Sequence, residues 1–359
     1  MFDHKHYVPI LRWKRAERVA LRFLTEQVKS YMTPLIEVTP RSFSPRASGR
    51  VPPVDEVLSH IAEDLLASWG TEPIFIDLWL LNPSLSVRNG LHPFIFLAAE
   101  ARARGVSLIP VTGLDRDDEY QNAVASLNAT NDGGVCVRLV RSDLERSALR
   151  TDLNRLLSRL HLQERQAHLL VDWQFVQGGC PDWTAALRSF PDLRLWRTLT
   201  VASGAFPPDL TRFTLGQHDL PRLDRLAWRR QVALEDPSLR RAAYGDYTIQ
   251  NPIYSEPPGL ANVSASIRYT ADEHWVIMRG EGLRNENGPG HAQYPANALL
   301  LRRRPEYCVC GPNFSYGDAY IHDKSEHPDP PGNPETWLRA GFNHHMTFVV
   351  RQVASLFVT

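Results

Sequence analysis

The sequence has few lysines and no net charge. Only four of its 40 basic residues are lysines, namely Lys5, Lys14, Lys29 and Lys324, so its positive charge is almost wholly arginine. Arginine suits bidentate contacts to carboxylate or phosphate, although a GC-rich genome would produce the same bias. Because 40 acidic residues balance the basic ones, no global field attracts nucleic acid or an anionic membrane. Binding of that kind must therefore depend on a local site.

The sequence also lacks several features that would assign it to a known class. Its four cysteines, Cys136, Cys180, Cys308 and Cys310, form no CxxC pair, which argues against a disulfide scaffold or a thiolate zinc site. No apolar run approaches the roughly 20 residues of a membrane span, and residues 1–12 lack the apolar segment of a signal peptide. No GxSxG, HExxH, Walker or helix-turn-helix pattern is present. We therefore expect a cytoplasmic protein without membrane contact.

Short apolar runs alternate with longer amphipathic stretches about every 30 to 40 residues, as in βα units. The predicted strands are Tyr7–Leu11, Pro34–Val38, Ile74–Leu78, Ser107–Val111, Val135–Val140, His168–Asp172, Trp196–Val201 and, eighth, Asp246–Ile249. The predicted helices between them are Ala16–Ser30, Val54–Trp69, Pro93–Arg104, Glu119–Leu127, Leu144–Leu160 and Trp183–Phe190. Several runs are apolar at consecutive positions, as strands buried on both faces are.

These eight strands favour an α/β fold with a (β/α)8 TIM-like barrel over an open doubly wound sheet. The first predicted βα turn, Arg12–Glu17, has no glycine-rich phosphate loop of the kind that a dinucleotide-binding sheet needs. We expect the barrel to occupy residues 1–255.

Residues 256–359 are predicted to form a C-terminal elaboration packed on the barrel. After about residue 205 prolines interrupt the alternation, which indicates loops around short elements. Ser264–Thr270 and His274–Gly280 alternate with period two, which predicts a β-hairpin. A final helix is predicted from about Glu335 to Phe357.

Functional groups of a (β/α)8 barrel gather at the C-terminal ends of its strands. The polar residues at or near the ends of the predicted strands include three carboxylates, Glu37, Asp77 and Asp172, the cations Lys14 and Arg138, and Asp246 with its neighbour Tyr247. If the three carboxylates share one site, their oxygens lie within roughly 10 Å of one another, with Arg138 or Lys14 among them.

Clustered carboxylates permit two kinds of chemistry. They can act as a general acid–base pair, or they can hold a divalent cation such as Mg²⁺ beside a phosphoester that Arg138 and Lys14 bind. A structural interpretation is also open, in which Lys14 and Arg138 neutralise buried carboxylates. The sequence does not choose among the three.

Histidines and hairpin residues supply further candidates. His4 and His6 precede the first strand, which places them on the face opposite the barrel mouth. His344 and His345 are neighbours on a predicted helix and point about 100° apart, so they cannot chelate one metal together, although either could reach a site.

The hairpin residues Arg268, Tyr269, Trp275 and Arg279 combine cations with aromatic rings, as base-binding clamps do. Strand alternation places Arg268 and Tyr269 on opposite faces, so the four residues cannot form one platform, and ordinary amphipathic packing is the favoured explanation.

Several segments resemble the "beta protein" family, which is found in phage-related and bacterial defence-associated gene neighbourhoods. The matching segments are Tyr7–Glu17, Pro34–Val38, Gly134–Leu139, Tyr244–Tyr247, Ile267–Thr270, Trp275–Gly280 and Gly341–His345. The resemblance covers nearly the whole chain. It implies a TIM-barrel-like protein of phage defence or phage–host conflict, but it implies no particular reaction.

Two functions follow as hypotheses. The first is a metal-assisted hydrolase or lyase that acts on a phosphorylated small molecule or nucleic acid at the barrel mouth, with a divalent cation as cofactor. The second is a non-catalytic barrel that senses a phage component or scaffolds a partner, such as a nuclease encoded nearby. Catalysis is assigned to Glu37, Asp77, Asp172, Lys14 and Arg138, and substrate binding to Asp246, Tyr247, Arg268, Tyr269, His344 and His345.

Overall fold

Eight parallel strands close into a barrel in the computed structural model, which describes residues 2–45, 49–129, 133–179, 182–188, 190, 193–233, 236, 239–256 and 262–356. The barrel strands are β1 (Tyr7–Arg12), β2 (Leu35–Glu37), β3 (Ile74–Asp77), β4 (Leu108–Thr112), β5 (Val135–Val140), β6 (Ala167–Phe175), β7 (Thr198–Gly204) and β9 (Ala243–Asp246). They follow one another around the barrel in chain order, and β9 pairs with β1 to close it. The predicted (β/α)8 fold is confirmed.

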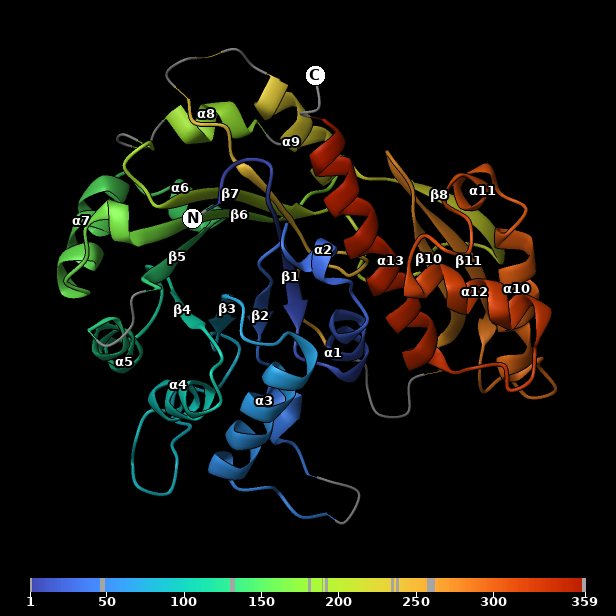
Figure 1. Cartoon of the computed structure of the whole chain (residues 1–359), viewed down its shortest axis with the longest axis horizontal. Coiled ribbons are helices and arrows are strands. Elements are labelled where there is room, and N and C mark those ends of the chain that lie inside the picture. The colour runs from blue at the N-terminus through green and yellow to red at the C-terminus, as the bar shows by residue number, and fades with distance from the viewer. Residues whose placement is uncertain are drawn as a thin grey trace.

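Helices surround the barrel as predicted, with two differences (Figure 1). They are α1 (Arg15–Arg22), α2 (Glu26–Lys29), α3 (Val54–Ser68), α4 (Pro93–Ala103), α5 (Asp118–Asn128), α6 (Arg141–Leu144), α7 (Leu149–Arg159), α8 (Trp183–Arg188) and α9 (Leu223–Ala233), with 3-10 turns η1 (Pro40–Phe43) and η2 (Glu164–Gln166). The helix predicted over 16–30 is two helices, because Thr25 caps α2 by accepting a hydrogen bond from the Val28 amide. The helix predicted over 144–160 begins later than expected, as α7 at Leu149, and Leu144 instead ends the separate short helix α6.

The eighth barrel strand lies earlier than predicted. The chain leaves β9 at Asp246, and Thr248 adopts a positive φ of 59°, which begins a turn where the sequence predicted a strand. Gly245 explains why this short run fits the barrel. A Cβ there would lie 2.9 Å from the Ala202 Cβ, closer than carbon atoms pack.

A second, antiparallel sheet stands beside the barrel. The predicted hairpin is present as β10 (Ser264–Thr270) and β11 (His274–Gly282), and β8 (Gly216–Pro221) joins it as a third strand by pairing with β11. We call residues 264–355 together with β8 the C-terminal module. It also contains η3 (Gly290–Ala292), α10 (Gln293–Leu301), α11 (Pro305–Cys310), α12 (Tyr316–Glu326) and α13 (Pro334–Ser355).

Strand β8 and helix α9 lie in the segment for which the sequence predicted loops around short elements. The β8 sequence is polar, so it has no apolar alternation, and pairing with β11 explains why it forms a strand. Because β8 lies before residue 255, the C-terminal module takes one strand from the segment assigned to the barrel.

Helix α13 joins the module to the barrel (Figure 1). It packs against α1 of the barrel layer on one side and against β10 on the other. Gly341 allows this close packing, since a Cβ there would lie 2.8 Å from the Arg268 carbonyl oxygen. The predicted final residue of this helix, Phe357, lies outside the described residues.

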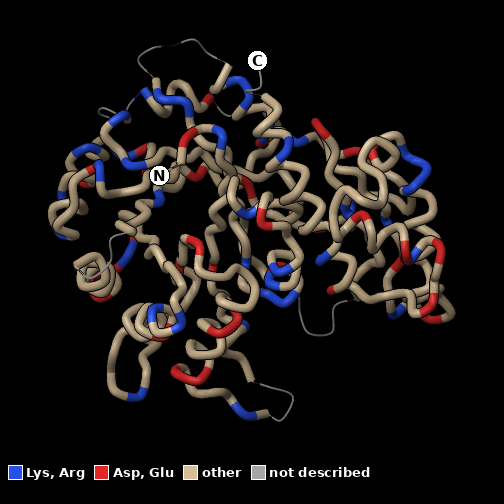
Figure 2. Tube along the Cα trace, in the orientation of Figure 1, with Lys and Arg blue, Asp and Glu red and all other residues tan. Residues whose placement is uncertain are grey.

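Two further findings bear on the expectations from composition. Within the described part of the chain, no helix combines the length and apolar character of a membrane span. Lysine and arginine are spread along the chain rather than gathered on one face (Figure 2).

Candidate functional site

A layer of charged side chains, which we call the charge layer, covers the apolar interior of the barrel at its C-terminal end. Inward-facing side chains alternate along a strand, so each charged residue stands two positions after an interior apolar one. The pairs are Ile10 and Arg12, Leu35 and Glu37, Phe75 and Asp77, Cys136 and Arg138, and Leu170 and Asp172. Strand register places Arg12 opposite Glu37, and Glu37 opposite Asp77. The fold therefore brings the predicted residues to one level.

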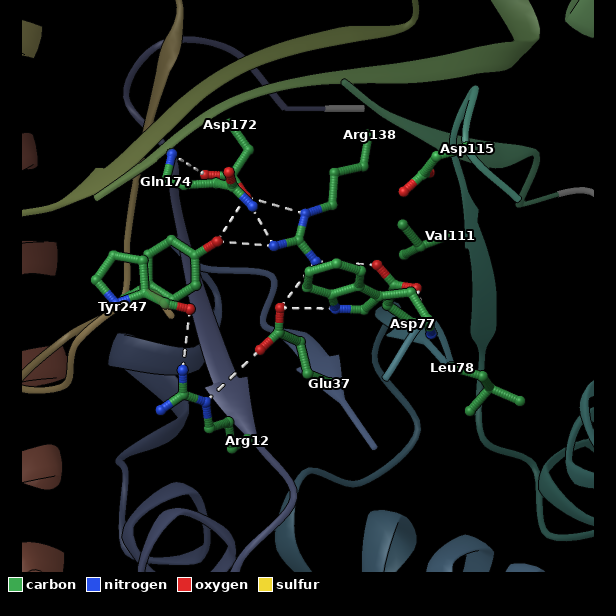
Figure 3. Close-up of polar contacts among 12 residues, drawn as sticks. Arg12, Glu37, Asp77, Leu78, Val111, Asp115, Arg138, Asp172, Gln174 and Tyr247 are labelled. Atoms are coloured by element: carbon green, nitrogen blue, oxygen red, sulfur yellow. Dashed lines mark hydrogen bonds and ion pairs between the residues drawn. The ribbon is translucent and has the colours of Figure 1, made fainter. Parts of the chain in front are cut away.

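Arg138 holds the three carboxylates together (Figure 3). Its Nη1 donates to Glu37 Oε1 at 2.9 Å and to Asp77 Oδ2 at 3.0 Å, while Nε and Nη2 donate to Asp172 Oδ2 at 3.0 and 2.7 Å. The Tyr247 hydroxyl lies 2.5 Å from the same Asp172 oxygen and 2.7 Å from Nη2. The carboxylates thus lie well within the predicted separation, and Arg138 is the cation among them.

Other side chains also contact the Glu37 and Asp77 carboxylates. Trp79 Nε1 donates to Glu37 at 3.1 Å, and Arg12 Nε lies 3.8 Å from the second Glu37 oxygen. Arg116 Nη2 donates to both Asp77 oxygens, at 3.2 and 3.3 Å. Three arginines, Arg12, Arg116 and Arg138, therefore face three carboxylates, and the charges of this buried network cancel.

Burial sets the electrostatics of the network. It raises the pKa of Glu37, an effect that Arg138 and then Arg12 oppose. Burial alone would lower the pKa of Arg138, but Tyr247 and the three carboxylates raise it well above its ordinary value. The guanidinium occupies the point at which the carboxylates converge, which is the position that a Mg²⁺ ion bound by all three would need.

Lys14 lies apart from this network. Its Nζ is 3.6 Å from Glu256 and 5.4 Å from the centre of the Tyr254 ring. It lines a separate feature of the barrel mouth, a cavity of about 1160 Å³ that we call the mouth cavity.

The mouth cavity lies between the barrel and the C-terminal module. Its walls come from the chain after β1, β2, β7 and β9, and from β10, β11, α10 and α13. Among the described residues, six cations line it, namely Arg12, Lys14, Arg15, Arg41, Arg268 and Arg279, against four acids, Glu17, Asp209, Glu256 and Glu335. Arg12 belongs to both regions, since it also contacts Glu37.

Several of these cations have no acidic partner. Among the described residues no carboxylate lies within 4 Å of Arg15, Arg268 or Arg279, whereas Lys14 and Arg41 share Glu256. Arg268 Nη1 donates to the Ile249 carbonyl at 2.7 Å, and its guanidinium lies 4.6 Å from the centre of the Phe206 ring. Burial lowers the pKa of Arg268 to about 10, so it remains charged at neutral pH. Positive charge is therefore in excess here.

The other predicted binding residues lie at the junction of barrel and module. Asp246 accepts hydrogen bonds from the Tyr7 hydroxyl at 2.5 Å and from His345 Nε2 at 2.9 Å, and His345 Nδ1 lies 2.8 Å from the Thr270 hydroxyl. His345 is fully buried, and burial lowers its pKa. This chain of contacts links β9 to α13 and β10.

His344 forms a second buried link within the module. Its Nδ1 lies 2.8 Å from an Asp318 carboxylate oxygen, and its Nε2 lies 2.8 Å from the Thr270 carbonyl oxygen. The Tyr269 ring stacks on it at 3.8 Å, and the Tyr269 hydroxyl donates to Asp318. Among the described residues that line the mouth cavity, neither histidine nor Tyr269 is present, whereas Arg268 and Arg279 are.

The remaining candidates lie away from the mouth. His6 contacts Thr33 at 2.9 Å at the opposite end of the barrel, and burial lowers its pKa to about 4. Within the described chain one set of possible metal ligands, Asp219, His274 and Glu306, has its donor atoms within 4.8 Å of one another. Arg304 already pairs with both carboxylates of that set.

Sequence reasoning missed several residues of the site. Arg12 and Glu17 flank the first βα turn, and Trp79, Arg116 and Gln250 come from loops. Arg12 carries a usable signal, because it directly follows the predicted strand Tyr7–Leu11 at an inward position. The loop residues carry none, since their contacts depend on how the loops fold over the mouth.

Fold and site define a class of protein, a (β/α)8 barrel with a neutralised charge layer inside and a cation-lined cavity at its mouth. Within that class the chain belongs to the family described as Beta protein, whose sequence model matches residues 7–351. This match confirms the resemblance drawn from the seven segments. The curated proteins contain no match to the chain.

Proposed function

We propose that this protein binds a phosphorylated small molecule or a segment of nucleic acid in the mouth cavity. The observation that supports this most directly is the excess of cations there, with Arg15, Arg268 and Arg279 free of carboxylate partners within 4 Å in the described chain. A guanidinium presents paired N–H donors that match phosphate oxygens. The cavity is also large enough for a small-molecule ligand.

Phage–host conflict is the setting that we propose for this binding, on the strength of the family resemblance. In that setting the barrel senses a phage-derived or phage-induced anion and passes the signal to a partner protein, such as a nuclease. The neutralised network around Arg138 supports a binding role over a metal-assisted one, because the guanidinium occupies the point where the three carboxylates converge.

A second candidate function is phosphoester hydrolysis in the same cavity. One observation favours it. Glu17 lines the cavity, and burial raises its pKa to about 7, the range in which a carboxyl group can serve as a general acid or base.

Binding is tested with the purified full chain, pyrophosphate and a fluorescein-labelled single-stranded oligonucleotide. We expect saturable binding that weakens linearly with the logarithm of salt concentration. Arg268→Gln and Arg15→Gln each weaken it about tenfold, since each removes a charge-assisted contact. The matched control is Arg155→Gln on α7, whose side chain is 73% exposed, and it binds like wild type.

The two roles give different results in the same experiment. Release of inorganic phosphate, or cleavage of the oligonucleotide, that Glu17→Gln abolishes supports the hydrolase. Binding without turnover supports the sensor, and loss of phage protection by Arg15→Gln but not by Arg155→Gln in a plaque assay ties either role to the cavity. Equal binding by all variants, or no binding at all, refutes the proposal.

A further inference from the structure

Glu17 is an unusual group in the wall of the mouth cavity. It lies in the first turn of α1 and is 2% exposed, yet no cation of the described chain lies within 4 Å of its carboxylate. Its side-chain partner is Gln250, whose Nε2 donates to Glu17 Oε1 at 2.9 Å. A buried carboxylate without an ion pair is costly when ionised.

Gln250 contacts both Arg12 and Glu17. Its amide oxygen accepts from Arg12 Nη1 at 3.4 Å while its amide nitrogen donates to Glu17. Burial raises the pKa of Glu17 to about 7, which its own amide, Gln250, Lys14 and Arg12 only partly oppose. Glu17 therefore changes charge near neutral pH, inside a cavity whose excess charge is positive.

The charged groups around Glu17 come from four elements and a turn. They are Arg12 of β1, Lys14 in the following turn, Arg18 along α1, Glu335 of α13 and Arg268 of β10. Glu335 is already paired with Arg339 at 2.8 Å. Among the described acids of the cavity wall, Glu17 is thus the buried one that has no arginine partner.

A second residue of the same wall has an unused donor. Trp13 lines the cavity and is 4% exposed, and its indole Nε1 has no hydrogen-bond acceptor among the described residues. A buried N–H without an acceptor is rare, and a bound ligand oxygen would satisfy it. Trp13 and Glu17 are four residues apart at the start of the first βα segment.

A carboxylate beside a bound oxyanion requires a proton between the two, because two facing anionic oxygens repel each other. The proton can come from Glu17, whose hydroxyl then donates to the ligand. It can also come from the ligand, when the ligand keeps a hydroxyl of its own, and the ionised Glu17 then accepts. Above neutral pH, a ligand with its own hydroxyl binds beside the ionised Glu17 without proton uptake. A fully deprotonated ligand binds there only if Glu17 takes up a proton.

We infer that Glu17 is a specificity-determining residue, through which the mouth cavity selects oxyanions that carry a proton, such as hydrogen phosphate, over fully deprotonated ones such as sulfate. This inference rests on the proposed function. It predicts a preference that grows with pH, because sulfate binding must be accompanied by protonation of Glu17, and hydrogen phosphate supplies the proton itself.

Calorimetric titrations with inorganic phosphate and with sulfate, at constant ionic strength from about pH 7.5 to about pH 9, test it. We expect sulfate affinity to fall about tenfold for each pH unit, as the uptake of one proton requires, while phosphate affinity changes little. In Glu17→Gln the sulfate affinity becomes independent of pH and the two anions bind about equally. Glu26→Gln on α2, whose side chain is 87% exposed and lies outside the cavity wall, is the matched control and follows wild type.

The outcomes separate this inference from the function on which it rests. If both anions bind wild type with the same pH dependence, or if Glu17→Gln keeps the preference, the role of Glu17 is wrong and anion binding stands. If neither anion nor pyrophosphate binds any variant, the proposed function is wrong and the inference falls with it. Circular dichroism of each variant confirms that it is folded.

Discussion

The charge layer inside the barrel and the mouth cavity above it are built from the same residue types but differ in how their charges are compensated. Inside, Arg138 and two further arginines face three carboxylates, and all three acids are at most 1% exposed. In the cavity, six cations face four acids, and Arg268, Arg15 and Arg279 lack a carboxylate partner among the described residues.

The difference follows from access to water. A charge removed from water costs several kcal/mol unless an opposite charge and hydrogen bonds replace the solvent, so the interior has to be balanced. The wall of an open cavity keeps part of its hydration and can carry excess charge until a ligand compensates it. We therefore expect mutations inside to affect mainly folding, and mutations in the cavity wall to affect mainly binding.

The largest effect is expected for Arg138→Met. The substitution leaves three buried carboxylates without their shared cation, and we expect it to lower the free energy of unfolding by about 5 kcal/mol. Urea unfolding followed by tryptophan fluorescence measures the loss. Arg155→Met on the exposed face of α7 is the control and changes stability by less than about 1 kcal/mol. A folded Arg138→Met protein of wild-type stability would contradict the comparison.

A smaller loss, about 3 kcal/mol, is expected for Asp172→Asn. The change removes one negative charge from a balanced set and leaves Arg138 with two carboxylates and the Tyr247 hydroxyl. The same urea titration measures it, with Asp152→Asn on α7 as the matched control, expected to cost less than about 1 kcal/mol. Unchanged stability together with lost phage protection would instead give Asp172 a catalytic role.

The smallest effect is a pH-dependent gain in Glu17→Gln. The pKa of Glu17 is about 7 in the folded state, above its ordinary value of 4.5, so the folded state binds the Glu17 proton more tightly than the unfolded state does. The stability that this proton contributes to the wild-type protein is lost as pH rises through 7. The free energy of unfolding of Glu17→Gln, relative to that of wild type, should rise by on the order of 2 kcal/mol between about pH 5 and about pH 8. Thermal unfolding at both values measures it. A constant difference between the two proteins would show that Glu17 does not titrate in this range.

Much of the barrel was predictable because its strands are buried on both faces. Seven of the eight runs found by apolar content share at least three residues with an observed strand, and Val135–Val140 matches β5 residue for residue. The eighth, Asp246–Ile249, overlaps β9 only at Asp246, since the short run Ala243–Asp246 has little apolar pattern and a glycine at its centre. Strand β8 was missed for the same reason.

The sequence indicated which residues form the charge layer, but it did not indicate which of them contact one another. Glu37, Asp77, Asp172 and Arg138 interrupt or end apolar runs, and this pattern alone indicated a shared site at the strand ends. Turn geometry decides two of the contacts, that of Lys14 with Glu256 and that of Tyr247 with Asp172. Thr248, for example, must adopt a positive φ in the turn that follows Asp246 and Tyr247.

By itself the sequence determined the closed parallel barrel and the identity of the charged residues at its C-terminal end, because burial and the two-residue alternation of a strand are local properties of the chain. Tertiary structure alone decided that Arg138 neutralises the three carboxylates, that the two histidines of α13 make buried polar contacts with Asp318, Thr270 and Asp246, and that a cation-lined cavity lies beside Glu17. These three features depend on the register of distant strands and on the packing of the C-terminal module, which no local pattern in the sequence reveals.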